Sequence, residues 1–251
     1  MFAGILLLAV FALRAVAVPF DQSHSLYDRV LKTYVKNALV DYAGLKAHPQ
    51  NLDRYLQELA SVDEAQFKTW TVNQQLAFLI NAYNASTLKL VADHYPIASI
   101  KDIGGLFGSP FRQDAVRLFG RTMTLDDLEH GIIRPRYHDP RVHFALVCGA
   151  RSCPQLRSEA YVGSRLDEQL RSQGRWFMLW RNQFDLENKS ASLSSIFHWF
   201  SEDFGGNQSA LLHFIAPYTE EGVRQSLESD PESWNITYVK YDWALNVQSV
   251  Q

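Results

Sequence analysis

Two cysteines stand near the middle of the chain, where an apolar run gives way to a short loop. The run from Val142 to Val147 leads into Cys148 and Gly149, and Cys153 follows before Pro154. A thiol at the end of a strand, beside a glycine that lets another backbone approach, is well placed to attack a carbonyl carbon. We therefore take Cys148 as the candidate nucleophile, with an oxyanion site expected on the backbone N–H groups around residues 149–151.

A thiol nucleophile needs a base, and two histidines could supply it. His143 and Cys148 are five residues apart, so in an ideal strand they point to opposite faces and lie about 16 Å apart. They can share a proton only if the strand bends, which makes His130 an equally good candidate. In a further alternative, His143 serves Cys153, which the loop brings back toward it.

The acid that would orient this base is expected at Glu129, on a helix predicted over residues 124–133. Thr124 is a suitable N-cap, and Glu129 falls inside the apolar stripe of the helix. A carboxylate that points inward needs a cation, a histidine or several hydrogen-bond donors. Glu129 is thus either the acidic member of a catalytic triad or half of a buried ion pair with Arg134 or Arg141. The apolar stripe consists of Leu125, Leu128 and Ile132.

Two asparagines lie three residues apart on a long, nearly all-apolar helix predicted over residues 73–94. Asn81 and Asn84 share one face of this helix. Buried amides must find hydrogen-bond partners, so the pair either orients a catalytic group or substrate amide, or ties the helix to a neighbouring loop. The residues alone favour the structural tie.

Other uses of the cysteines compete with the nucleophile. A disulfide between Cys148 and Cys153 in an exported protein would remove the thiol, and a buried cysteine often acts only as a small hydrophobic residue. The spacing of the histidines and cysteines matches no zinc motif, so we predict no metal and no cofactor. The chain also lacks a Gly-rich phosphate loop, a GxSxG motif and an HExxH motif.

Composition describes a globular protein. The 251 residues are 47% hydrophobic and 13% aromatic, and the net charge of −3 gives no support for nucleic-acid binding. The apolar run at residues 1–13 is shorter than the ~18–20 residues of a membrane-spanning helix, and Ala15-Val-Ala17 has the form of a signal-peptidase site. We predict a signal peptide over residues 1–17, although Arg14 follows the apolar run instead of preceding it. This implies export to the periplasm or the extracellular space, without a stable membrane span afterwards.

The remainder, residues 18–251, shows no repeat and no linker and is predicted to be a single domain. The expected fold is α+β, predominantly helical with a small sheet. Residues 96–121 are expected to be irregular. Strands are expected at residues 141–148 and near residues 238–243. Helices are predicted over residues 22–38, 51–60, 63–68, 73–94, 124–133, 163–174, 194–203 and 209–216.

These motifs together resemble the family known as domain of unknown function 547, over roughly residues 40–246. The resemblance rests on Phe78–Asn84, Leu128–His130, His143–Cys148 with Ser152-Cys-Pro154, and Tyr241–Asn246. The family is similar to papain-like or transglutaminase-like thiol enzymes. It thereby implies a papain-like fold, Cys148 as nucleophile, His143 or His130 as base, Glu129 as orienting acid and Asn81 or Asn84 as polar support. Leu79 departs from the family pattern, which has an aromatic residue there.

We therefore expect an exported thiol-dependent hydrolase or acyl transferase, peptidase-like, that acts on a peptide or another amide-containing substrate. The alternative is a non-catalytic protein-interaction module in which the same polar residues only stabilise the fold. A slow-reacting or bonded pair of cysteines would favour the module, and one fast-reacting thiol would favour the enzyme.

Overall fold

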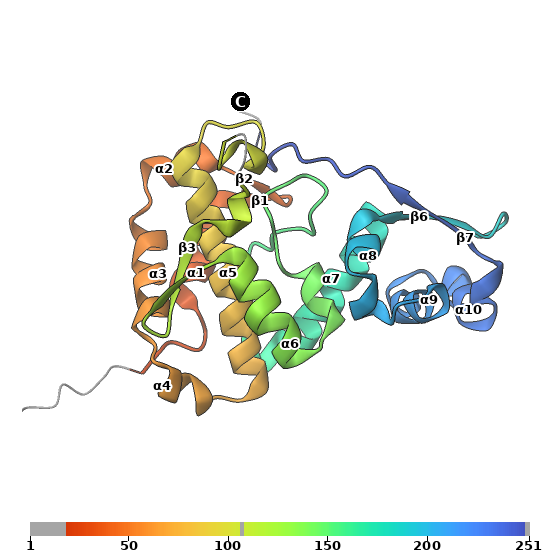
Figure 1. Cartoon of the computed structure of the whole chain (residues 1–251), viewed down its shortest axis with the longest axis horizontal. Helices are drawn as coiled ribbons and strands as arrows, with labels where there is room; N and C mark the ends of the chain where they lie inside the picture. The colour runs from red at the N-terminus through yellow and green to blue at the C-terminus, as the bar shows by residue number, and fades with distance from the viewer. Residues whose placement is uncertain (1–18, 106–107, 249–251) are drawn as a thin grey trace, which may run out of the picture.

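A long central helix, α5 (Val72–His94), organises the fold in the computed structural model, which describes residues 19–105 and 108–248 (Figure 1). A capping box fixes its first turn: the Thr71 hydroxyl accepts a hydrogen bond from the Gln74 N–H, and the Gln74 side chain accepts one from the Thr71 N–H. The helix is buried on nearly all sides from Gln75 to Ala92, as its all-round apolar sequence predicts. The predicted signal peptide, residues 1–17, lies outside the described residues.

Short helices near the N-terminus cover one side of α5. α2 and α3 pack directly against it, and α1 packs on α3. The predicted helix over residues 22–38 is too long, because Asn37 and Ala38 have positive φ angles and turn the chain into a small hairpin. The elements of this part are α1 (Ser25–Tyr34), β1 (Val35–Lys36), β2 (Leu39–Val40), α2 (Tyr42–Ala47), α3 (Gln50–Ser61) and α4 (Glu64–Lys68).

The segment predicted to be irregular, residues 96–121, contains regular structure. A β-hairpin of β3 (Asp114–Leu118) and β4 (Arg121–Thr124) turns at Gly120, which has a φ of +70°. Two short 3₁₀ turns precede it, η1 (Ile100–Asp102) and η2 (Pro110–Arg112). β3 packs against α3 and α5.

The helix predicted over residues 124–133 exists, but its core is a π-helical turn, η3 (Asp127–Ile133). π-helical turns are rare and often occur at functional sites. The prediction that the helix stops before Pro135 is wrong. Helix α6 (Arg134–Tyr137) continues directly from η3, so Pro135 lies within the helical stretch, just after the π-helical turn.

The strand predicted at residues 141–148 is also wrong. Asp139 accepts a hydrogen bond from the Arg141 N–H and starts a 3₁₀ turn, η4 (Pro140–Phe144). The chain then continues without regular structure to Cys148, although every residue from Val142 to Val147 is buried. Periodicity alone cannot separate such a buried apolar segment from a strand.

The narrower end of the molecule holds α9, α10 and a three-stranded sheet (Figure 1). In that sheet β6 pairs antiparallel with β5 and parallel with β7. The predicted helices over residues 163–174, 194–203 and 209–216 are present with shifted ends. The elements are η5 (Gly163–Arg165), α7 (Leu166–Arg181), β5 (Gln183–Asp185), β6 (Ser190–Ser194), α8 (Ser195–Trp199), η6 (Ser201–Phe204), α9 (Gln208–Ile215), η7 (Ala216–Tyr218), α10 (Glu221–Ser229), η8 (Pro231–Ser233) and β7 (Asn235–Val239).

The predicted fold class is confirmed: the chain is a predominantly helical α+β domain with small sheets. Within residues 19–105 and 108–248, no helix combines the length and the apolar character that a membrane crossing needs.

After β7 the chain returns along the molecule and holds the cysteine loop in place. The backbone N–H of Arg151 donates to the carbonyl of Ala244 (2.8 Å), and that of Asn246 donates to Gly149 (2.9 Å). A bridge also joins Ala150 to Leu245. The loop that carries both cysteines is therefore anchored by a segment about a hundred residues further along the chain.

Candidate functional site

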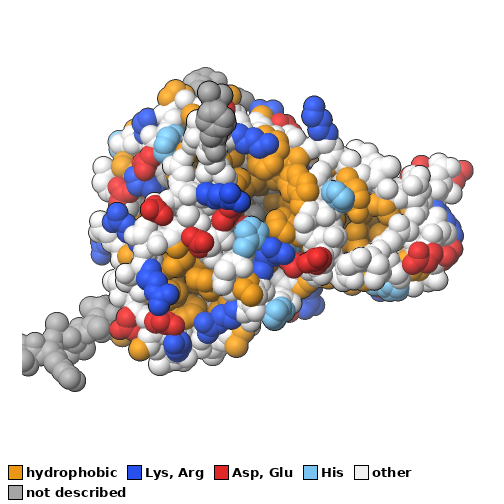
Figure 2. All heavy atoms as spheres, in the orientation of Figure 1, with side chains coloured by type: hydrophobic (Ala, Val, Ile, Leu, Met, Phe, Trp, Pro, Cys, Tyr) orange, Lys and Arg blue, Asp and Glu red, His pale blue; other side chains and the backbone are white. Residues whose placement is uncertain are grey.

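A cleft of about 150 Å³ opens where the cysteine loop, η3, α8 and the C-terminal segment meet. Figure 2 shows hydrophobic side chains gathered across the middle of this face, between the larger helical part and α8. Four of the six predicted site residues line the cleft: Glu129, His130, His143 and Cys148. The walls are mainly aromatic, formed by Tyr83, Phe111, Trp199, Phe200, Tyr241 and Trp243.

The bend in the chain explains how His143 and Cys148 come to share this cleft. η4 ends at Phe144 and an irregular segment follows, so the two residues are not held on opposite faces of a strand. Both side chains can therefore line the same cleft.

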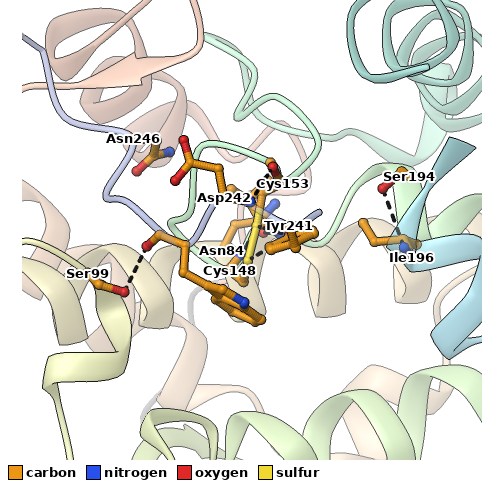
Figure 3. Close-up of a disulfide and its surroundings, with 12 residues drawn as sticks. Asn84, Ser99, Cys148, Cys153, Ser194, Ile196, Tyr241, Asp242 and Asn246 are labelled. Atoms are coloured by element: carbon orange, nitrogen blue, oxygen red, sulfur yellow. Dashed lines mark hydrogen bonds between the residues drawn. A yellow bond between two sulfur atoms is a disulfide. The ribbon is translucent and has the colours of Figure 1, made fainter. Parts of the chain in front are cut away.

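The two cysteines are joined by a disulfide, Cys148–Cys153, at the edge of the cleft (Figure 3). Gly149 has a φ of +81° and reverses the chain between them. In this state Cys148 carries no thiol, so the expected free nucleophile is absent and the competing disulfide interpretation describes the structure. Cys148 is partly exposed, whereas Cys153 is only 2% exposed.

Hydrogen-bond donors surround the sulfur atoms. The Tyr241 hydroxyl lies 3.2 Å from Sγ of Cys153, to which it donates, and 3.4 Å from Sγ of Cys148. The backbone N–H of Cys148 also donates to Sγ of Cys153, at 3.1 Å. Burial raises the pKa of Tyr241, so its hydroxyl keeps its proton at neutral pH. The sequence resemblance includes Tyr241, but the residues alone did not mark it as a contact of the sulfur atoms.

The acid that holds His143 is Asp203, on η6, and not Glu129. Nε2 of His143 lies 2.6 Å from a carboxylate oxygen of Asp203, while its Nδ1 lies 3.9 Å from Glu129, beyond hydrogen-bond distance. The Asp203 carboxylate accepts, so Nε2 carries the proton and Nδ1 presents a lone pair. Phe200 stacks on the ring at 4.2 Å. Burial lowers the pKa of His143 to about 4, which keeps the ring neutral.

Glu129 is buried in the wall of the cleft, as the helix pattern predicts, and is 9% exposed. Burial raises the pKa of its carboxyl group to about 7, against the opposing effects of the Tyr83 hydroxyl and the nearby Arg134. The expected ion pair with Arg134 is not formed, because Arg134 binds both oxygens of Asp203, at 2.6 and 2.9 Å. A carboxyl group with a pKa near neutrality can both give and take a proton.

His130 lies at the exposed edge of the cleft. Its Nδ1 is 2.8 Å from Nη1 of Arg134, and an arginine can only donate. The neutral ring therefore carries its proton on Nε2 and can act there as a donor but not as a base. Burial and the adjacent Arg134 charge lower the pKa of His130. Of the two histidines, His143 is the one whose free nitrogen can accept a proton.

The two asparagines tie α5 to neighbouring loops. The Asn84 amide donates to the carbonyl of Ala145 and accepts from the N–H of Val147, both at 2.9 Å. Asn81 makes the same pair of contacts with the backbone of Tyr161. Each amide thus gives the backbone of an irregular segment the hydrogen bonds that a neighbouring strand would otherwise supply. This geometry is the structural alternative stated for these residues, and Asn84 supports the segment that leads to Cys148.

The structure offers no grouping for a metal ion among the residues it describes: no three His, Cys, Asp or Glu side chains come together as a ligand set. The backbone donors expected for an oxyanion are also partly engaged, since the N–H of Arg151 is bound to Ala244.

Comparison with known proteins gives one finding. Searches of curated proteins and of solved structures returned no match, and the expected papain-like fold therefore has no support from a relative. The family model described as "Protein of unknown function, DUF547" matches residues 67–178. This region includes α5, η3, His143 and both cysteines. The resemblance seen in the sequence is thereby confirmed over these residues, and the chain carries a DUF547 region.

Proposed function

We propose that the chain, once its disulfide is reduced, is an exported thiol-dependent hydrolase or acyl transferase that acts on peptide or other amide bonds. The observation that carries this proposal is the convergence of Cys148, His143 and Glu129 on one cleft. His143 is held there by an ionised acid on its far nitrogen, which is the arrangement that orients a catalytic base.

In this proposal the Cys148 thiol passes its proton to Nδ1 of His143, and the sulfur attacks the carbonyl carbon of the substrate. The amine leaves with a proton returned from the imidazole, and a thioester remains on Cys148. Water or an acceptor amine then attacks the thioester and regenerates the thiol. Asp203 stabilises the imidazolium formed in the first step, and His130 offers its Nε2 proton at the rim.

The proton affinities of the site depend on the state of the sulfur. With the disulfide closed, burial lowers the pKa of His143 to about 4, despite the adjacent Asp203 carboxylate. A thiolate at Cys148 adds a negative charge to the same cleft, and a nearby opposite charge favours the protonated imidazole. Glu129, with a carboxyl pKa near 7, provides a second group that exchanges protons at neutral pH.

The disulfide favours a second candidate, the non-catalytic interaction module. With both sulfur atoms bonded, the cleft is a mainly aromatic hollow that could hold an apolar part of a partner protein. The disulfide also agrees with export, because such bonds persist in oxidising compartments. Export is itself a proposal, tested by whether the secreted protein begins after residue 17.

A pair of cysteine variants separates the two candidates. Fluorogenic peptidyl amides are offered to the oxidised chain, to the chain reduced with a phosphine, and to Cys148→Ser and Cys153→Ser. The enzyme proposal expects turnover by the reduced chain and by Cys153→Ser without any reductant, and none by Cys148→Ser. Cys153→Ser is the matched control, because both variants lack the disulfide. Measurable and equal turnover by the two variants would refute Cys148 as the nucleophile. No turnover by either variant or by the reduced chain would favour the module.

A further inference from the structure

The two sulfur atoms of the disulfide differ in their surroundings. Both cysteines line the cleft, but Cys148 is partly exposed there, whereas Cys153 is only 2% exposed. In thiol–disulfide exchange an incoming thiolate attacks one sulfur and displaces the other, and the outcome depends on access to the attacked sulfur and on the stability of the displaced thiolate. The structure lets both factors be judged for this pair.

Access favours attack at Cys148. Cys148 is partly exposed where it lines the cleft, and the Tyr241 hydroxyl lies 3.4 Å from its sulfur. Cys153 also lines the cleft but is only 2% exposed. An external thiol would have to reach an almost fully buried residue, in a loop that the C-terminal segment holds through Ala244 and Asn246.

The stability of the displaced thiolate favours the same direction. Sγ of Cys153 already accepts hydrogen bonds from the Tyr241 hydroxyl (3.2 Å) and from the Cys148 N–H (3.1 Å). The Arg181 guanidinium donates to the backbone carbonyl of Cys153 (3.1 Å), which places a positive charge near this residue. Donors and a nearby cation stabilise a thiolate over a thiol. Cys153 is therefore the better leaving group.

We infer that low-molecular-weight thiols open this disulfide at Cys148, which becomes S-thiolated while Cys153 leaves as a thiolate held by Tyr241. In this step the incoming thiolate forms a new S–S bond with Sγ of Cys148, and the Cys148–Cys153 bond breaks. A second thiol then attacks the mixed disulfide and releases Cys148 as a thiolate. The two external thiols are oxidised to their own disulfide and the protein disulfide is reduced.

This gives Cys148 a third state between the bonded and the free thiol. An S-thiolated Cys148 cannot attack an acyl group, so this modification blocks the proposed enzyme. It is reversible, because a second thiol removes it. The inference does not depend on that activity, since the exchange is measured without an acyl substrate. A chain that exchanges at Cys148 and hydrolyses nothing would refute the proposed function alone.

The experiment maps the first adduct. The oxidised full chain is mixed with excess glutathione at pH 8, quenched with acid at intervals, alkylated with N-ethylmaleimide and digested for mass spectrometry. The early adduct is expected to carry glutathione on Cys148 and maleimide on Cys153. The reverse pattern, or an even distribution between the two, would overturn the inference.

A rate measurement tests the role of Tyr241. Removing its hydroxyl in Tyr241→Phe is expected to slow opening by glutathione about threefold to tenfold, the effect of losing one ordinary hydrogen bond. Tyr238→Phe is the control, because this side chain is 42% exposed on β7, and its rate should stay within about twofold of the unmodified chain. Equal rates for both variants would contradict the assigned stabilisation, and the adduct map needs no variant at all.

Discussion

Glu129 makes the stability of the protein depend on pH in a way that one substitution can isolate. Its carboxyl pKa is raised by burial from 4.5 to about 7. Below pH 4.5 the group is protonated in both the folded and the unfolded chain. Between pH 4.5 and 7 only the folded chain holds the proton, so rising pH favours unfolding. The free energy of unfolding therefore falls across this range and levels off above pH 7.

The size of the effect follows from the shift. Each pKa unit corresponds to about 1.4 kcal/mol, so a shift from 4.5 to about 7 amounts to roughly 3 kcal/mol, most of which is lost between pH 5 and pH 8. Glu129→Gln keeps the shape of the protonated acid and cannot ionise. We expect its free energy of unfolding, relative to the unmodified chain, to rise by about 2–3 kcal/mol from pH 5 to pH 8.

Two buried histidines change the stability with pH in the opposite sense. Comparing Glu129→Gln with the unmodified chain removes their effect. Burial lowers the pKa values of His24 and His143 from 6.5 to about 4. Their contribution to stability is present above pH 6.5 and is lost as the pH falls toward 4. It occurs in both proteins and cancels in the difference between them.

Urea unfolding followed by circular dichroism at pH 5, 6, 7 and 8 measures this difference. Glu187→Gln is the control, because Glu187 is exposed, and its difference from the unmodified chain should vary by less than about 0.5 kcal/mol over the same range. A difference for Glu129→Gln that does not change with pH would refute the assigned environment of the carboxyl group.

Other substitutions test the remaining parts of the site. Asn84→Ala leaves the Ala145 carbonyl and the Val147 N–H without their partner, and we expect a loss of about 2–4 kcal/mol in urea unfolding; a loss below 0.5 kcal/mol would contradict the structural role. Asp203→Asn removes the charge that holds His143, so acylation of the reduced chain should slow by about tenfold or more, with an unchanged rate counting against the assignment. His130→Gln removes a histidine that has no free base nitrogen; it should slow acylation less than His143→Gln does, and the reverse order would make His130 the base.

The parts of the fold that the sequence predicted best are those with a strong local pattern. α5 is apolar on nearly every side, so both its existence and its burial followed from its run of apolar residues. The inward position of Glu129 and the structural use of the asparagines also followed, because each depends on the face of a single helix.

The parts that failed depend on contacts between distant segments. The apolar residues 142–147 looked like a strand, but their backbone partner is the side chain of Asn84, about sixty residues earlier in the chain. Asp203 was not predicted as the partner of His143, because this contact also spans sixty residues. No motif surrounds it, and an acid in a short turn after a helix is usually a solvated surface residue.

The cysteine pair shows where residue types alone leave a choice open. A separation of five residues allows a loop disulfide or a nucleophile with a neighbouring thiol. The choice was decided here by the turn at Gly149 and by the C-terminal segment that closes the loop. The proposed nucleophile therefore exists only in the reduced molecule.

Trapping the acyl intermediate tests the central claim most directly. The reduced chain is mixed with an activated acyl ester, quenched in acid within seconds, and its peptides are weighed by mass spectrometry. We predict a thioester on the peptide that carries Cys148, formed also by Cys153→Ser and lost in Cys148→Ser. An adduct that forms on Cys153 instead, or no adduct on either cysteine of a fully reduced and folded chain, would contradict the account.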